Sequence, residues 1–67
     1  MAVSDISNSD LTKLIEDWIK SERDRQILKR RLIDGVTFSE LAAAFYLSER
    51  QVKNIVYRGE QTIFKHL

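Results

Sequence analysis

Apolar residues recur at helical spacing along most of the chain. In the first such stretch they fall at positions i, i+3, i+4, i+7 and i+8, as Leu11, Leu14, Ile15, Trp18 and Ile19. This spacing predicts an amphipathic helix that begins at Ser9 and Asp10, as cap and acidic first turn, and ends near Lys20. A second helix is predicted after the cap residue Ser21, with Ile27, Leu28 and Leu32 as its buried stripe. Gly35 is expected to end it in a left-handed conformation.

Residues 37–58 carry two capping signals in close succession. Thr37 is followed three residues later by Glu40, and Ser48 is followed three residues later by Gln51. Each pair matches the capping box, in which a hydroxyl and a longer side chain satisfy free amides of the first turn. The signals predict a short helix from Phe38 to Phe45, a bend over residues 46–48, and a longer helix that begins at Glu49. This is the length pattern of a helix-turn-helix.

The apolar positions of the two predicted helices fit that motif. Leu41, Ala42 and Phe45 share one face of the shorter helix, and the small side chain of Ala42 suits a close crossing. In the longer helix the inner stripe is formed by Val52, Ile55, Val56, Gly59, Ile63 and Leu67. A glycine in this stripe indicates a close helix crossing or a bend.

Length and composition favour one small helical domain. The chain has 67 residues, no cysteine, no proline and two glycines, which excludes a disulfide framework and disfavours a turn-rich sheet. We expect an all-α, tetrahelical four-helix bundle over residues 9–67, preceded by a flexible arm of residues 1–8. No apolar run is long enough to cross a membrane and no signal peptide is evident, so a cytoplasmic location is expected.

The face of the longer helix opposite its apolar stripe is rich in groups that bind DNA. Arginine and asparagine grip guanine and adenine, and lysine, tyrosine and arginine also hold phosphates. Ser48 and Glu49 open the helix, where side chains enter a groove first. The face itself carries Arg50, Lys53, Asn54, Tyr57 and Arg58. A merely solvated charged face is the alternative, but the caps and the short preceding helix favour DNA binding.

Charge is unevenly distributed along the chain. Residues 1–22 sum to −3 and residues 23–67 to +4, so a polyanion is a suitable partner for the second part. Arg30 and Arg31 either compensate the dipole at the end of their helix or contact DNA backbone. Trp18 either anchors the first helix or lies in a homodimer interface, and Phe64 either covers the first helix or meets a partner subunit.

Catalytic chemistry is not indicated. His66 is the only histidine and lies at the C-terminal end of the last predicted helix, where a dipole-compensating role is expected. The chain offers no histidine pair, cysteine or carboxylate cluster for a metal, and no glycine-rich phosphate loop. We expect neither an enzyme nor a cofactor.

Residues 21–67 resemble region 4 of the bacterial sigma-70 family of RNA polymerase factors. The resemblance rests on two segments, SERDRQILKRRLIDGVTFSELA at residues 21–42 and LSERQVKNI at residues 47–55. It implies a tetrahelical DNA-binding fold with a recognition helix in the major groove. It also implies a phosphate contact by Thr37 and base contacts by the recognition-helix positions, which hold Ser48, Glu49, Arg50, Lys53 and Asn54.

Three departures from the family pattern shape the functional expectation. Glu49 and Arg50 reverse the usual order of charges, so the family's promoter element is not carried over. Tyr46 stands where glycine is common in the turn. The other sigma regions are absent, so we expect a stand-alone transcriptional regulator of bacterial or phage type, specific for a double-stranded DNA sequence. The alternative is a module that binds RNA polymerase or a sigma or anti-sigma partner.

Overall fold

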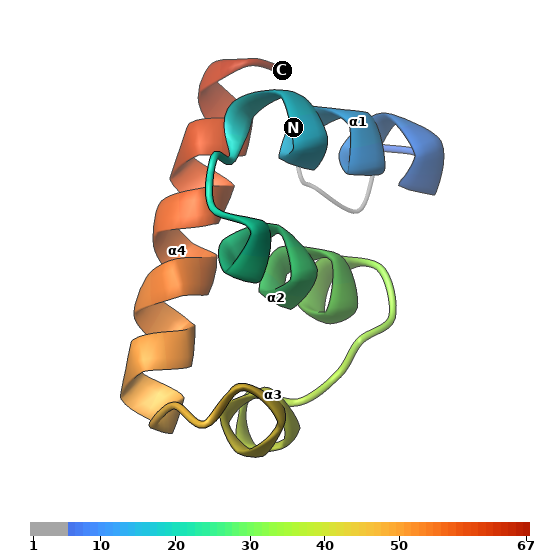
Figure 1. Ribbon diagram of the computed structural model, residues 1–67. Coiled ribbons are helices and arrows are strands. Elements are labelled where there is room, and N and C mark those ends of the chain that lie inside the picture. The colour runs from blue at the N-terminus through green and yellow to red at the C-terminus, as the bar shows by residue number, and fades with distance from the viewer. Residues whose placement is uncertain (1–5) are drawn as a thin grey trace.

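Four helices make up the fold in the computed structural model, which describes residues 6–67. They are α1 (Asn8–Trp18), α2 (Glu22–Leu32), α3 (Phe38–Phe45) and α4 (Glu49–Lys65). Figure 1 shows α4 running along one side of the molecule, with α1 beside its C-terminal end and α3 beside its N-terminal end. No strand occurs in the described residues. The predicted all-α, four-helix fold is confirmed.

Each helix begins at a hydroxyl cap, although the first cap differs from the prediction. Ser7, not Ser9, caps α1 and accepts a hydrogen bond from the amide of Asp10 at 3.2 Å. Ile6 packs against the core just before this cap, at the position that a hydrophobic staple occupies relative to Leu11. Ile6 was assigned to the flexible arm, so the predicted start of this helix was too late. Residues 1–5 of that arm lie outside the described residues.

The other three caps fall at the predicted residues. Ser21 accepts from the amide of Asp24, and Thr37 accepts from the amide of Glu40 at 3.1 Å. Ser48 and Gln51 form the complete reciprocal capping box. The predicted Thr37 box is only half made, because the structure contains the hydroxyl contact and lacks the returning one from Glu40.

One hydrophobic core joins all four helices. Its fully buried members come from every helix, and they include the inner stripe of α4 from Val52 to Ile63. Leu67 was predicted to extend that stripe, but it is half exposed because α4 ends at Lys65. The buried hydrophobic side chains are Leu11, Ile15, Ile19, Ile27, Leu28, Leu41, Ala42, Val52, Ile55, Val56 and Ile63.

At Gly59, α4 packs closely against the Leu28 side chain of α2. A Cβ atom at this position would lie 2.5 Å from Cδ1 of Leu28, a side chain that is itself fully buried. The crossing interpretation of this glycine is therefore confirmed. At the end of α2, Gly35 has the predicted left-handed φ of 71°, two residues after the C-cap Ile33.

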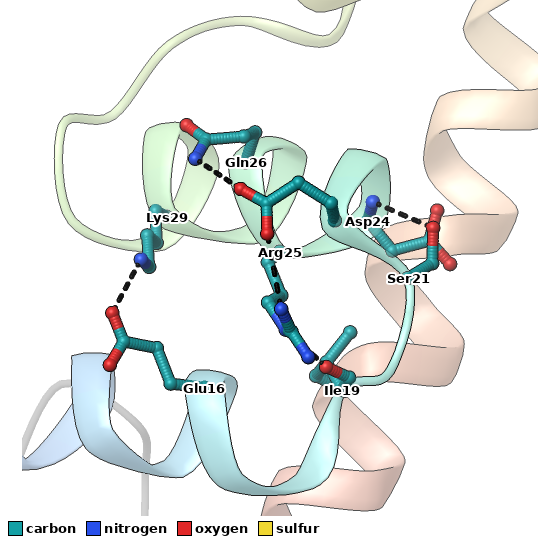
Figure 2. A network of polar contacts seen from close by, with 8 residues as sticks. Glu16, Ile19, Ser21, Asp24, Arg25, Gln26 and Lys29 are labelled. Carbon is teal, nitrogen blue, oxygen red and sulfur yellow. Dashed lines mark hydrogen bonds and ion pairs between the residues drawn. The ribbon is translucent and has the colours of Figure 1, made fainter.

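Polar contacts fix the connection between α1 and α2 (Figure 2). Nε of Arg25 donates to the carbonyl of Ile19, the C-cap residue of α1. Lys29 of α2 forms an ion pair with Glu16 of α1 at 2.9 Å. Glu22 accepts hydrogen bonds from Gln26 and Arg25, and these lower the pKa of Glu22 below its usual 4.5. Their contribution to stability is present above that value and is lost as pH falls through the lowered pKa.

Trp18 was predicted either to anchor the first helix or to lie in a homodimer interface, and the structure places it at the surface between α1 and the end of α4. Its side chain is 47% exposed, and its ring stacks on that of His66 with centroids 3.6 Å apart and planes within 3°. It therefore joins the last turn of α1 to the C-cap of α4 without entering the core. Phe64, two residues before His66, is 43% exposed.

No helix among residues 6–67 is both long enough and apolar enough to span a membrane.

Replacing Gly59 by alanine tests the α2–α4 crossing. Helix propensity alone would raise the free energy of unfolding by about 1 kcal/mol. The clash with Leu28 overpacks a buried contact, which costs roughly 1–3 kcal/mol. We predict that Gly59→Ala lowers the free energy of unfolding in a urea titration. The exposed Gln61→Ala serves as the control and should change it by less than about 0.5 kcal/mol; a stabilised Gly59→Ala variant would contradict the close crossing.

Candidate nucleic-acid interface

A tight turn joins α3 to α4 at the predicted residues. Tyr46 is the C-cap of α3, with φ 57° and ψ 43°, and it is the only non-glycine residue with positive φ between residues 6 and 67. Its amide and that of Leu47 both donate to the carbonyl of Ala42. Leu47 packs partly against the core. Tyr46 thus adopts the conformation that glycine usually supplies, and the helix-turn-helix forms with the predicted bounds.

The outer face of α4 presents the predicted DNA-binding side chains to solvent. Its inner face is buried against α2 and α3, so the two faces are clearly separated. The caps Thr37 and Ser48 are exposed at the starts of α3 and α4. The exposed side chains on the outer face belong to Glu49, Arg50, Lys53, Asn54, Tyr57 and Arg58.

The basic side chains of this face form no ion pair within residues 6–67. Within residues 6–67 the salt bridges are Arg23–Asp24, Arg25–Glu22 and Lys29–Glu16, all of which involve α2. None of the basic side chains on the outer face of α4 takes part in them. A basic surface without carboxylate partners attracts a polyanion more strongly than one that is neutralised locally.

One flank of the face is formed around Phe38, the first residue of α3. The guanidinium carbon of Arg31 lies 4.2 Å from the centre of its ring, and Nζ of Lys53 lies 5.7 Å away. The ring of Tyr57 meets it edge-on, with centroids 6.3 Å apart. Arg31 also donates from a terminal nitrogen to the carbonyl of Val36 at 3.2 Å. Arg31, Lys53 and Tyr57 are therefore brought together.

Arg30 is not part of that group. Its guanidinium carbon lies 5.3 Å from the ring centre of Phe45, at the other end of α3 from Phe38. The same two roles were predicted for Arg30 and Arg31, since both lie in the last turn of α2. In the structure the two arginines lie over different rings, Arg30 over Phe45 and Arg31 over Phe38. Neither contact was predicted from the sequence.

A cavity of about 140 Å³ lies between the first turn of α2 and α4. Arg23 from the first turn of α2 and Arg58 from α4 line it together with Asn54. The Nε atom of Arg58 also faces the carbonyl of Asn54 at 3.5 Å. Sequence reasoning missed Arg23 because it is remote from α4 along the chain and only the tertiary fold places it there.

The family comparison covers the same elements. The family model for sigma-70, region 4 matches residues 21–63, which is well over half of the chain. The chain belongs to the sigma-70 region 4 family. No curated protein and no solved structure gives a significant match.

Sigma-70 region 4 is a helix-turn-helix DNA-binding region, so membership supports a DNA-binding role for this chain. The matched residues include α2, α3 and most of α4. Helix α1 lies before the match, yet it packs on both α2 and α4. In this region 4 domain, α1 therefore completes the core at the end farthest from the turn (Figure 1).

Replacing Tyr46 by glycine tests the geometry of the turn. A left-handed conformation costs a side-chain-bearing residue roughly 1–2 kcal/mol, and glycine removes this strain from the folded state. Glycine also increases the conformational entropy of the unfolded chain, which offsets part of the gain in stability. The Tyr46 side chain is 96% exposed, so its loss removes little packing. We predict that Tyr46→Gly raises the free energy of unfolding by roughly 0.5–1 kcal/mol.

The matched control for this variant is Ala44→Gly, an exposed position inside α3. It should lower the free energy of unfolding by about 1 kcal/mol. Equal destabilisation by both glycines would show that Tyr46 is not left-handed in solution.

Proposed function

We propose that this protein is a transcriptional regulator that binds a specific double-stranded DNA sequence through α4 in the major groove. The observation that carries the proposal is the outer face of α4, the second helix of the helix-turn-helix. This face presents basic and amide side chains, and its basic side chains form no ion pair within residues 6–67. A helix fits the width of the major groove, and its N-terminal residues meet base edges.

Arg50 and Asn54 are proposed to read bases. Both are exposed, and they lie one helical turn apart on α4. Arginine recognises guanine and asparagine recognises adenine through paired hydrogen bonds. Glu49, at the start of α4, is suited to accept a hydrogen bond from the amino group of cytosine.

The phosphate contacts are proposed to surround these base contacts. Thr37 and Ser48 use a lone pair to accept from the amides of Glu40 and Gln51, so their hydroxyl protons are free to donate to phosphate oxygens. The cationic and phenolic side chains proposed for the same task are Arg30, Arg31, Lys53, Tyr57 and Arg58, with Arg23 added by its place beside Arg58.

Substitutions at Arg50 and Lys53 should separate base reading from phosphate binding. Arg50→Ala should cost roughly 1–3 kcal/mol on the preferred sequence and relax the choice of one base. Lys53→Ala should weaken specific and random duplexes alike and reduce the salt slope by about 1. The preferred sequence is obtained by selection from random duplexes, and affinities follow from fluorescence anisotropy over a range of salt concentrations.

The contrast between the two variants is the decisive result. If Arg50→Ala weakens preferred and random duplexes by the same factor, Arg50 does not read a base. If selection enriches no sequence from random duplexes, the regulator proposed here is not sequence-specific.

A second candidate function is supported by the other end of the molecule. Trp18, Phe64 and Leu67 are large apolar side chains that remain about half exposed near the junction of α1 with the end of α4. Such a group suits a protein partner, which would be RNA polymerase, a sigma or anti-sigma protein, or a second copy of this chain. This function would not require the outer face of α4.

Salt dependence and the fluorescence of Trp18 should distinguish the two functions. DNA affinity should fall steeply with salt through counterion release, whereas an apolar protein contact should change little. Trp18 is the only tryptophan and is the last residue of α1, the helix that lies farthest from the turn (Figure 1). We therefore predict that its emission is nearly constant when DNA is added. A shift in Trp18 emission as protein concentration rises, without DNA, would favour self-association.

A further inference from the structure

Phe38 lies where three helices meet the proposed DNA surface. It is the first residue of α3, directly after the cap Thr37, and its side chain is only partly buried. Its ring packs against the edge of the core and is also contacted by side chains from the end of α2 and from α4.

Three proposed DNA-binding side chains contact this ring. Arg31 approaches to 4.2 Å and Lys53 to 5.7 Å from the ring centre. Tyr57 meets the ring at an interplanar angle of 73°. Lys53 and Tyr57 are one turn apart on α4, so a single ring orients two neighbouring positions of that helix.

Such contacts matter because long cationic side chains lose much rotational freedom on binding. A ring face attracts a cation through its quadrupole and so favours a subset of its rotamers before DNA arrives. Less conformational entropy is then lost when the cation meets a phosphate. A leucine at the same place would fill a similar edge of the core but would offer no such attraction.

We infer that Phe38 is a positioning residue for DNA binding: its ring holds Arg31 and Lys53 in place for the phosphates beside the groove. This inference rests on the proposed function. Phe38 itself contributes no hydrogen bond to DNA through its side chain and acts through its neighbours. The pair formed by Arg30 and Phe45 includes no residue of α4, so it has no equivalent effect on the recognition helix.

The test compares Phe38→Leu with two other variants of the full chain. Phe38→Tyr keeps an aromatic ring and is the rescue variant. Leu14→Val shortens a side chain of α1 that, like Phe38, is partly buried against the core, and it is the matched control. Kd for a 20-base-pair duplex is measured for each by fluorescence anisotropy at several salt concentrations, and folding is checked by circular dichroism.

Phe38→Leu should raise Kd roughly 3- to 10-fold at low salt, as expected for the loss of one or two cation–ring contacts. It should also reduce the slope of log K against log salt by about 1, because a phosphate contact is lost. Phe38→Tyr should restore both quantities to near the original values. Leu14→Val should leave both unchanged.

A double-mutant cycle with Lys53→Gln measures whether Phe38 acts through Lys53. The effect of Lys53→Gln on Kd should be at least roughly 2-fold smaller when combined with Phe38→Leu than alone. Additive effects together with an unchanged salt slope would show that Phe38 only packs against the core, and would overturn the inference.

Two further results keep the inference separate from the proposed function. If the original chain binds duplexes and Phe38→Leu binds them equally well, the positioning role is wrong while the function stands. If the original chain binds no duplex at low salt, both are wrong. Should Phe38→Leu fail to fold, nuclear Overhauser contacts in the unaltered protein decide: contacts from the Phe38 ring to both Arg31 and Lys53 are expected, and their absence overturns the inference.

Discussion

The crossing of α2 and α4 at Gly59 is the constraint on which the rest of the structure depends. Leu28 occupies the space that a side chain at Gly59 would need, so the two helices approach closely only because that side chain is absent. Their contact sets the position of α4, and both α1 and α3 pack against the pair that α2 and α4 form. A domain of 67 residues has a small core and little stability to spare, so one misfitted contact at this crossing affects the whole fold.

This arrangement gives α4 different surroundings along its length. Near the turn, only its inner face is covered, and the outer face remains open with its basic side chains unpaired within residues 6–67. Near its C-terminus, α1 approaches it and Trp18 stacks on His66. The carboxylates that do pair with basic residues belong to α1 and α2, and among the proposed phosphate contacts only Arg23 is paired, with Asp24.

The sequence was sufficient to predict the features that depend on neighbours along the chain. Helical spacing, the capping box of Ser48 and the apolar stripe of α4 are local patterns, and the structure confirms them. The start of α1 was placed wrongly because two serines offered equivalent caps and the packing of Ile6 was not apparent. Local patterns also gave no sign that Tyr46 would accept the left-handed conformation.

Contacts between distant residues could not be predicted in the same way. The spacing of Phe38 in the sequence marks it only as a helix start, whereas its neighbours Arg31 and Lys53 are known from the fold. The place of Arg23 beside Arg58 is likewise a tertiary result. The candidate DNA-binding residues of α4 were predictable as one face, and Arg31 was a candidate, but the places of Phe38 and Arg23 beside this face were not predictable.

The most direct test of the account is nuclear magnetic resonance mapping of the ¹⁵N-labelled protein as a short duplex is added at low ionic strength. The account predicts that shifts concentrate at Thr37 and along the outer face of α4 near its N-terminus, and that the indole of Trp18 and the amide of Phe64 change little. Shifts confined to Trp18, Phe64 and their neighbours, or no shifts with any duplex, would contradict the claim that this face of α4 meets DNA.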